Sequence, residues 1–388
     1  MKYNFDEEVN RFNCNSLKWD VKKGELPMWV ADTDFKTLPE VIDAINKKIN
    51  IGALGYSIVP DRYFEAYSSF WKRRHNVELK KEWMVYSTGV VAAISSMVRK
   101  LTSVGENVLI QSPVYNIFYN SIYNNGRNIL SSDLVYKDGK YSIDFKDLED
   151  KMANPQTSLM ILCNPHNPVG KIWTKDELDR IGRLAYKYNV LVISDEIHCE
   201  NISPNKEYVP FISANNINKD ISVTCLAMSK AFNLAGLQSA CIVCTNSNLR
   251  HKVYRGINTD ECGEPNIIAI EGNIAALENG DQYLKELNEY IYKNKKYFVD
   301  TVISSLDNVS VRLTDATYLL WVDVSKITKN SDALVDFIRE KTGLIVSSGS
   351  EYGKNGDGFI RINLATTFKN VQDGTSRFIK SIKDFTKE

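Results

Sequence analysis

The residue best suited to covalent chemistry is Lys230, in the sequence Ser229-Lys-Ala-Phe-Asn-Leu-Ala-Gly236. Residues 221–227, Ile-Ser-Val-Thr-Cys-Leu-Ala, are apolar enough for a buried strand and lead the lysine into a turn of small residues. An amine held against apolar neighbours loses solvation of its charged form, so its pKa falls and it becomes a usable nucleophile. Most such lysines simply point to solvent, so the interpretation depends on what the fold brings near Lys230.

Two further polar residues follow earlier apolar segments. Asp195 ends the apolar stretch Val-Leu-Val-Ile-Ser, and Asn167 lies in the turn Asn-Pro-His-Asn-Pro-Val-Gly170. Taken alone, the carboxylate reads as a helix cap or surface charge, and the asparagine as part of a tight turn. Together with Lys230 they meet the needs of pyridoxal phosphate (PLP): an amine for a Schiff base, a carboxylate for the pyridine nitrogen and a donor to the phenolic oxygen.

The elements that would position these residues alternate between apolar strands and amphipathic helices. A capping box, Thr174-Lys-Asp-Glu177, opens one helix. Such alternation predicts an α/β fold with a mostly parallel sheet covered on both faces, and ligands at the carboxyl ends of its strands. The predicted strands are 83–86, 107–111, 158–163, 190–194, 221–227 and 239–244.

At 388 residues the chain exceeds the usual size of one core, which favours two lobes. We predict a large domain of residues 46–284 and a smaller α+β domain of residues 1–45 plus 285–388. The smaller domain should hold a long helix over 284–303 and strands at 318–324 and 344–347. It should also hold a helix capped by Ser331 and ended by Gly343, and a final apolar-faced helix.

The combined motifs resemble the fold-type-I, class I/II aminotransferase superfamily over nearly the whole chain. They are Asn-Pro-x-Asn-Pro-x-Gly, Asp-Glu-x-His, Ser-Lys-x-Phe-Asn-x-x-Gly and Phe-Ile-Arg-Ile-Asn363. Within that superfamily, Pro27-Met-Trp-Val-Ala-Asp-Thr-Asp-Phe35 and Gly55-Tyr-Ser-Ile-Val-Pro-Asp61 resemble the MalY/PatB-type cystathionine β-lyases. The resemblance implies a seven-stranded-type sheet and PLP as cofactor.

The resemblance also implies a role for each matching residue. Lys230 matches the Schiff-base lysine and general base, Asp195 the pyridinium partner and Asn167 a donor to the phenolic oxygen. Tyr115, in Ser112-Pro-Val-Tyr115, matches the aromatic residue stacked on the ring, and we count it with Lys230 as catalytic. His198 stands where many aminotransferases have a tyrosine reaching that oxygen, although a packing role is an open alternative.

A phosphate site is expected where Ser87-Thr-Gly-Val-Val91 opens an apolar-sided helix. Free amides and the helix dipole favour an anion there, with Gly89 allowing close approach and Val90 and Val91 contributing amides. Ser229 should add a hydroxyl. The resemblance implies that Tyr56 reaches the phosphate of a neighbouring subunit, in a homodimer with a shared active site.

Two positions depart from the aminotransferase pattern. Gln238 stands where many members have a phosphate-binding arginine, and Ala227 replaces a common serine. A doubly charged phosphate anchor is therefore in doubt, which places more weight on amides, hydroxyls and Tyr56.

The amino-acid substrate should be bound by Arg361, which matches the arginine that holds the α-carboxylate by two hydrogen bonds. Asn167 and Trp29 are expected beside it, with parts of segment 119–123. Tyr318 is either a pocket wall or plain core.

Bulk composition narrows the partners. Lys+Arg and Asp+Glu are equal at 48 each, without a basic stripe, so nucleic acid and anionic membranes are poor candidates. No apolar run has membrane-helix length, and the acidic N-terminus is not a signal peptide. Seven scattered cysteines favour a reducing cytoplasm, and Cys241 with Cys244 read as strand residues rather than a redox or metal pair, so no metal is expected.

The leading hypothesis is a PLP-dependent carbon–sulfur β-lyase that cleaves L-cystathionine or related cysteine S-conjugates to thiol, pyruvate and ammonia. The alternative is an aminotransferase that uses the same residues. A binding protein or regulator on this fold is a third possibility, which the retained lysine, aspartate and arginine disfavour. Nucleotide-binding glycine motifs are absent from the sequence.

Overall fold

Seven short segments of the central chain form one sheet in the computed structural model, which describes residues 2–387. All neighbouring strands are parallel except β10, which runs antiparallel to both of its neighbours. The predicted mostly parallel, seven-stranded sheet is therefore confirmed. In spatial order the strands are β2 (Met84–Ser87), β10 (Ala240–Val243), β9 (Ser222–Leu226), β8 (Leu191–Asp195), β7 (Thr157–Cys163), β3 (Asn107–Ile110) and β4 (Asn128–Ser131).

Six of these strands lie where the apolar runs predicted them, with boundaries shifted by a residue or two. The prediction missed β4, because this edge strand is partly exposed and its sequence Asn-Ile-Leu-Ser is not an apolar run. In the six predicted strands most side chains are buried, as a sheet covered on both faces requires.

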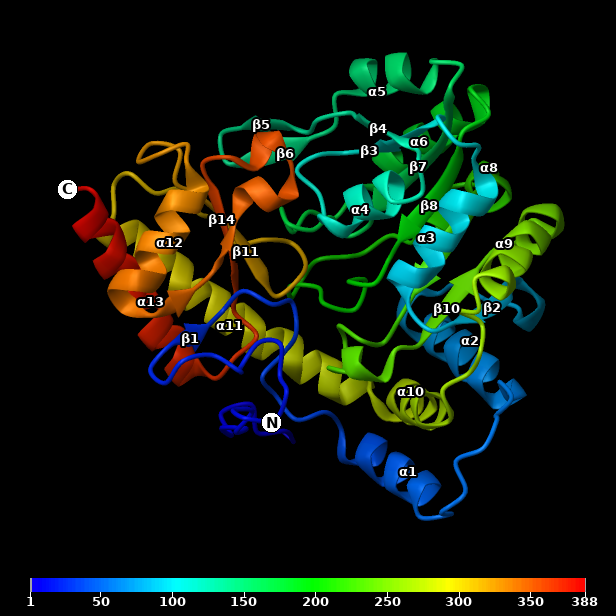
Figure 1. Ribbon diagram of the computed structural model, residues 1–388, viewed down its shortest axis with the longest axis horizontal. Coiled ribbons are helices and arrows are strands. Elements are labelled where there is room, and N and C mark those ends of the chain that lie inside the picture. Colours follow the sequence, from blue (N-terminus) through cyan, green and yellow to red (C-terminus); the bar gives the residue numbers. More distant parts are fainter. Residues whose placement is uncertain (1, 388) are drawn as a thin grey trace.

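Helices cover both faces of the sheet (Figure 1). One face packs against α3 (Val90–Leu101), α4 (Ile117–Tyr123) and α9 (Ser247–Thr259). The other packs against α2 (Asp61–His75), α5 (Phe145–Met152), α6 (Lys175–Lys187), α7 (Phe211–Ala214), α8 (Asn216–Ile221) and α10 (Ile267–Asn279). The predicted capping box at Thr174 and Glu177 opens α6.

A second, smaller sheet follows the long helix α11 (Asp281–Ser305). Its antiparallel strands are β11 (Leu319–Asp323), β14 (Phe359–Asn363) and β13 (Ser347–Ser348), in that spatial order. Helices α12 (Ser331–Thr342) and α13 (Phe368–Phe385) pack on this region with α11. The remaining elements are a hairpin, β5 (Val135–Lys137) and β6 (Lys140–Ser142), and the 3₁₀ turns Lys81–Trp83, Ala235–Leu237, Gly349–Tyr352 and Lys354–Gly356.

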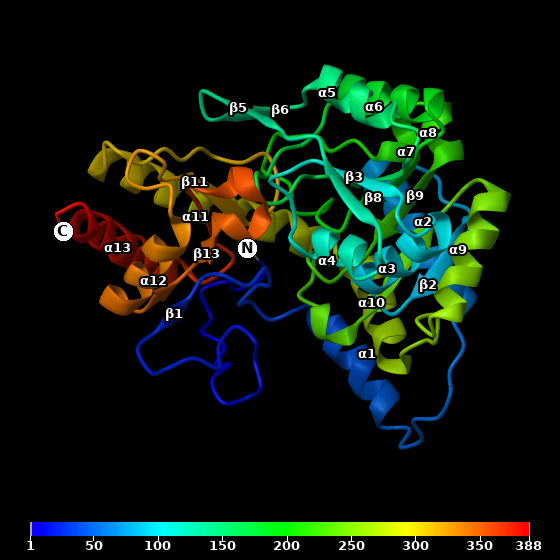
Figure 2. The ribbon, with the colours of Figure 1, turned by 45° about the horizontal axis from the view of Figure 1, so that its top comes forward.

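The N-terminal segment crosses to this smaller region before the chain enters the large sheet. Strand β1 (Leu26–Pro27) pairs with β12 (Leu344–Ile345), whereas α1 (Pro39–Ile49) packs on α10 (Figures 1 and 2). The predicted division at residues 45/46 and 284/285 falls inside α1 and α11 and stays a prediction.

One predicted cap is wrong. Helix α12 is capped by Asn330, whose side chain accepts from the amide of Ala333, rather than by Ser331. The Ser331 hydroxyl instead accepts from the amide of Gly358 at 2.8 Å. Gly343 ends the helix as predicted, with a φ of 71° that favours glycine.

Candidate active site

The predicted chemical residues meet at the carboxyl ends of the large sheet's parallel strands. Asp195 is the last residue of β8, Asn167 follows β7, and Lys230 follows β9. They line one cavity of about 360 Å³. The other residues of its lining are Ala31, Thr88, Gly89, Val90, Val91, Ala92, Tyr115, Cys163, Ile197, His198, Ala227, Ser229, Ala235, Gln238 and Ser239.

Lys230 extends into this cavity from the turn after β9. Its Nζ donates to the backbone carbonyl of Ala31 at 2.6 Å. Burial lowers the pKa of the amine from 10.5 to about 8, an effect that the nearby Asp32 carboxylate partly opposes. The predicted fall in pKa is confirmed, and a substantial fraction of the amine is neutral near pH 8.

Asp195 is a buried carboxylate without a paired cation. It accepts a hydrogen bond from the amide of Ile197 at 3.1 Å, and no lysine or arginine among residues 2–387 forms an ion pair with it. Burial raises the pKa of this carboxyl to about 7. A protonated ring nitrogen placed opposite Asp195 would supply the missing positive charge and favour the ionised carboxylate.

Arg361 lies beside the cavity, in the centre of β14, and is 5% exposed. It donates to the Asn167 side-chain oxygen at 3.3 Å and to the Trp29 carbonyl at 2.9 Å. The ring of Tyr352 lies 4.9 Å from its guanidinium carbon. The Nε atom is buried with no partner among the described residues. Because Asn167 is neutral, its contact with Arg361 does not neutralise the charge of the guanidinium. A buried guanidinium that lacks a carboxylate and has a free N–H is a ready site for an anionic ligand.

The start of α3 forms the opposite part of the cavity. Gly89 precedes the first helical residue, and no side chain caps the amides of this first turn. A Cβ added at Gly89 would meet nothing within 4 Å, so open space lies in front of these amides. Val90 and Val91, whose amides are expected to bind the phosphate, line the cavity, and Val91 is 42% exposed. Ser229 and Thr88 add hydroxyl-bearing side chains.

Two aromatic groups complete the walls. Burial, with a contribution from Asp195, raises the pKa of Tyr115 to about 12, so its hydroxyl stays protonated. Burial lowers the pKa of His198 to about 3, so its imidazole is neutral, and its Nδ1 has no described partner. The His198 ring lies 6.0 Å from that of Tyr318, which is fully buried and donates to the Ala31 carbonyl at 2.8 Å.

Three predicted residues do not line this cavity. Trp29 and Arg361 lie next to it, and the contribution of Trp29 is its backbone carbonyl. Tyr56 is fully exposed in the segment between α1 and α2 and lines a separate surface groove with residues 264–267. In segment 119–123, Tyr119 bonds to Ser112 and to the Tyr352 carbonyl, whereas Tyr123 is exposed.

The sequence did not point to Thr88, Gln238 or Ala31 as part of the cavity wall. Ala31 acts through its carbonyl, which carries no side-chain signal. Gln238 stands where many family members have an arginine, and the sequence shows it only as a departure from that pattern.

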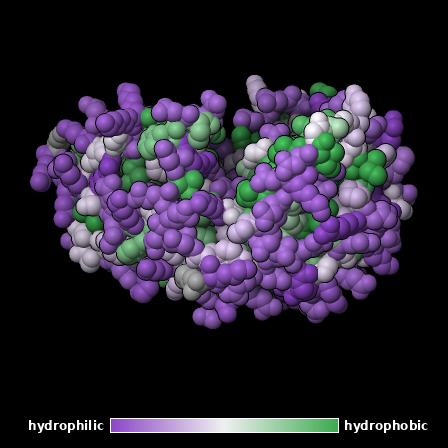
Figure 3. All heavy atoms as spheres, turned by 90° about the horizontal axis from the view of Figure 1, so that it is seen from below, coloured by the Kyte–Doolittle hydropathy of each residue, from purple (hydrophilic) through white to green (hydrophobic). Residues whose placement is uncertain are grey.

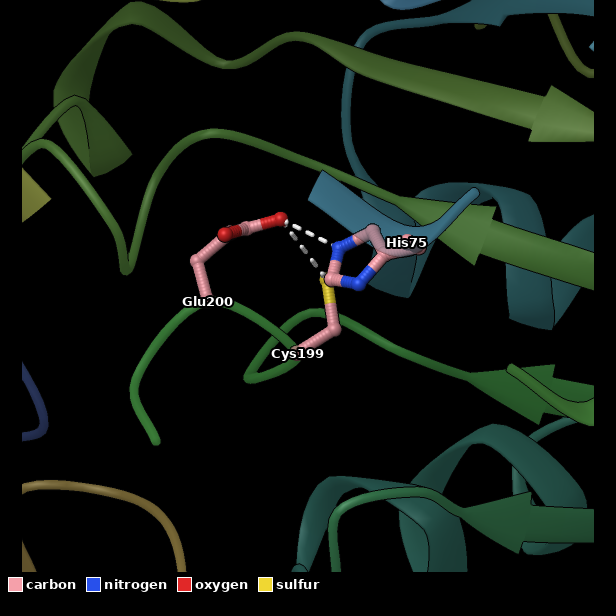
Figure 4. Close-up of side chains that lie close together, drawn as sticks. All are labelled: His75, Cys199 and Glu200. Atoms are coloured by element: carbon pink, nitrogen blue, oxygen red, sulfur yellow. Dashed lines mark hydrogen bonds and ion pairs between the residues drawn. The ribbon is translucent and has the colours of Figure 1, made fainter. Parts of the chain in front are cut away.

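A separate cluster of His75, Cys199 and Glu200 brings three potential metal ligands within 4.8 Å of one another (Figure 4). Both Glu200 oxygens are already used, one by His75 at 2.7 Å and the other by Arg74. Burial holds the pKa of the Cys199 thiol well above its usual value, so the thiol is protonated. Because Glu200 is paired with Arg74 and the thiol is protonated, we interpret the cluster as a contact that joins α2 to the turn after β8 rather than as a cation site.

The Cys241 and Cys244 pair also has a structural explanation. Both are buried free thiols, and they pack into different cores on the two faces of the sheet. Side chains three positions apart along a strand point to opposite faces, so the two sulfurs are not arranged around one metal or in one disulfide.

Comparisons with known proteins agree with this geometry. The sequence profile described as aminotransferase class I and II matches residues 28–378. Cystathionine beta-lyase PatB of Bacillus subtilis (strain 168) is 37% identical over 381 residues, which cover 96% of this chain and 98% of PatB. Two solved structures are similar along almost their whole length. Cystalysin from Treponema denticola, which contains a pyridoxal 5'-phosphate cofactor, has a TM-score of 0.95 at 32% identity and covers 99% of this chain and 100% of its own. The PLP-bound C-S lyase from Staphylococcus hominis has a TM-score of 0.92 at 32% identity and covers 98% of each chain.

Proposed function

We propose that this chain, which belongs to the aminotransferase class I and II family, is a PLP-dependent carbon–sulfur β-lyase. Its substrate would be L-cystathionine or a related cysteine S-conjugate, which it would convert to a thiol, pyruvate and ammonia. The observation that carries the proposal is one cavity that contains an amine of lowered pKa, a buried unpaired carboxylate and an uncapped helix start. The similarity to cystathionine beta-lyase PatB and to the C-S lyase from Staphylococcus hominis supports β-elimination over transamination.

The residues present fit PLP. Lys230 would hold its aldehyde carbon, Asp195 its ring nitrogen and Tyr115 its ring face, while Asn167 and His198, which line the same cavity, would contact its phenolic oxygen. The phosphate would be held by the amides that follow Gly89, with the Ser229 hydroxyl. When bound, PLP draws electrons from the substrate's α-carbon and makes its proton acidic.

Lys230 would move the proton that this reaction releases. An amine with a pKa of about 8 is basic enough to accept the α-proton and is partly neutral at physiological pH. The Ala31 carbonyl gives the free amine a fixed acceptor inside the cavity. Asp195 would keep the proton on the ring nitrogen, because a buried carboxylate is weakly screened by water and attracts that N–H strongly.

Arg361 would orient the amino-acid substrate. Its Nε–H has no partner, and the Nη2 group beside it keeps a second N–H in addition to the one that contacts the Trp29 carbonyl, so these two N–H groups can form a planar fork for the α-carboxylate. The Trp29 carbonyl and the Tyr352 ring hold the guanidinium in place. Holding the α-carboxylate at Arg361 would orient the substrate relative to the Lys230 amine.

A homodimer is the assembly that this surface supports, with a second copy of the chain as partner. Tyr56 is fully exposed, and apolar residues of α1 and the segment after it are exposed with it: Ile42, Ile49, Ile51, Leu54 and Ile58. Figure 3, viewed from the side on which α1 lies, shows apolar side chains gathered on the lobe that contains the large sheet. Covering them with another copy would bury apolar area and bring Tyr56 to the partner's phosphate site.

We also propose that the enzyme works in the cytoplasm. All seven cysteines are free thiols, which suits a reducing compartment. Among residues 2–387, no helix combines the length and the apolar character that crossing a bilayer requires.

The proposal is tested by incubating the PLP-loaded protein separately with cystathionine, cystine and cysteine, and measuring pyruvate, thiol and keto acid together. We expect pyruvate and thiol in equal amounts, none of either with Lys230→Ala, and unchanged rates with the exposed control Lys252→Ala. Stoichiometric keto acid without pyruvate would make the protein an aminotransferase, and absence of pyruvate from every thioether would exclude the lyase.

A further inference from the structure

Alternate backbone carbonyls of one N-terminal segment contact the two residues that carry the chemistry. The Trp29 carbonyl accepts from Arg361 at 2.9 Å. Two residues later, the Ala31 carbonyl accepts from Lys230 at 2.6 Å and from Tyr318 at 2.8 Å. We call residues 29–35 the strap. The positions of both acceptors depend on how firmly the strap is held, because a backbone carbonyl has no side-chain freedom of its own.

The next carbonyl after each of these two, that of Val30 and that of Asp32, faces Asn363, two residues after Arg361 in β14. Its side-chain nitrogen, Nδ2, donates to the carbonyls of Val30 at 2.6 Å and Asp32 at 2.7 Å. Its side-chain oxygen accepts from the amide of Ala365 at 2.8 Å, so the orientation of the amide is fixed. Residues two apart in a strand project from the same face, which is why Asn363 and Arg361 both reach the strap.

Asn233 clamps the other end of the strap in the same way. It lies three residues after Lys230, and its side-chain nitrogen donates to the carbonyls of Thr33 at 2.9 Å and Phe35 at 3.2 Å. Asn233 has a φ of 58°, a left-handed backbone that asparagine tolerates better than most residues. Each site residue thus has, a few positions further along the chain, an asparagine that bridges alternate carbonyls of the strap.

We propose that Asn363 and Asn233 are positioning residues, which fix the carbonyl acceptors of Arg361 and Lys230 by clamping the strap. This inference rests on the proposed function for what the two site residues bind. Neither asparagine lines the cavity. Their effect passes through the backbone, and it reaches both ends of the substrate site at once.

The test compares Asn363→Asp with a matched control, Asn218→Asp. Aspartate has the shape of asparagine but donates nothing and faces the two carbonyls with a carboxylate. Asn218 is also fully buried and also bridges two carbonyls, those of Leu178 and Phe211, but it lies in α8, outside the cavity lining. Asn233→Gly is the second variant, because glycine keeps the left-handed backbone and removes only the clamp.

Two quantities are measured for each variant beside its melting temperature. The first is KM for cystathionine in the PLP-loaded enzyme, which we expect to rise about tenfold or more in Asn363→Asp as Arg361 loses its fixed orientation. The second is the pH midpoint at which Lys230 of the apoprotein is acylated, mapped by mass spectrometry. It should fall by about half a unit in Asn233→Gly, because the ammonium loses the fixed Ala31 acceptor. This quantity is read from Asn233→Gly alone, because the new carboxylate of Asn363→Asp would itself raise the pKa of the amine. Asn218→Asp should lower the melting temperature and change neither quantity.

A purely structural role would give a different result. The positioning role is refuted if both variants lower the melting temperature as Asn218→Asp does, while Asn363→Asp keeps KM within about twofold and Asn233→Gly leaves the acylation midpoint unchanged. The acylation measurement needs neither PLP nor turnover. A wild-type protein that forms no pyruvate would therefore refute the proposed function and still leave the strap testable.

Discussion

Replacing Arg361 with lysine tests the substrate site while keeping its positive charge. The Nε–H of Arg361 is free, and the Nη2 group beside it keeps one N–H in addition to the N–H that contacts the Trp29 carbonyl, whereas Nη1 donates to Asn167. A lysine ammonium is a single point of attachment and cannot reproduce the planar fork. One hydrogen bond between charged groups contributes about 1.5–3 kcal/mol. Its loss should lower kcat/KM by about 10- to 150-fold, since about 1.4 kcal/mol corresponds to a factor of ten.

The assay follows pyruvate formation from cystathionine and from the same substrate with its cysteine α-carboxylate converted to an amide. Wild type should be much slower on the amide, and Arg361→Lys should lose less than about threefold relative to wild type there, because no carboxylate remains to be bound. Arg62→Lys is the matched control. Arg62 forms a two-point contact with Glu278, but both residues lie on the surface.

The reasoning is refuted if Arg361→Lys loses as much activity on the amide as on the free acid. That result would mean that Arg361 supports the fold or the cofactor rather than the substrate carboxylate. A loss on the free acid below about threefold would equally contradict a two-point fork.

Three other predictions concern the cofactor, the assembly and the effect of pH. Asp195→Asn should retain a visible band of bound PLP but slow pyruvate formation by about 10²–10³-fold, because a neutral amide does not stabilise a protonated ring nitrogen; an unchanged rate would contradict its role. If two subunits share each site, mixing refolded Lys230→Ala and Tyr56→Ala chains should restore about a quarter of wild-type activity, since half of the dimers contain one intact site; no recovery would contradict the sharing. Burial lowers the pKa of Lys295 in α11 from 10.5 to about 7, so above pH 7 the unfolded state binds more protons and stability rises with pH. Denaturant unfolding should therefore show a gain between pH 7 and 8.5 that is smaller by about 1–2 kcal/mol in Lys295→Met, and equal gains in both proteins would contradict this sign.

The sequence predicted best where side-chain chemistry or apolar periodicity carried the signal. Asp195 ends a buried apolar strand, and Lys230 and Asn167 each follow one. Because parallel strands bring their carboxyl ends to one edge of the sheet, the convergence of the three residues could be expected. Strand β4 was missed because an exposed edge strand lacks an apolar run. The cap of α12 was misplaced by one residue because Asn330 and Ser331 are both good caps, and only tertiary contact with Gly358 decides between them.

The contacts that the sequence could not predict are mostly hydrogen bonds to backbone carbonyls. The carbonyls of Trp29 and Ala31 accept hydrogen bonds from Arg361 and Lys230. Every residue has a backbone carbonyl, so no residue type in the sequence indicates such a contact across more than 190 positions. Tyr56 illustrates a different limit, because its predicted role depends on a second chain, and within one chain it is simply exposed.

The measurement that tests the central claim most directly is borohydride reduction of the PLP-loaded protein, followed by digestion and mass spectrometry. We expect the pyridoxyl group on the peptide that contains Lys230 and on no other, together with loss of pyruvate formation. A label on another buried lysine such as Lys295, or none at all, would contradict the proposal that Lys230 binds the cofactor.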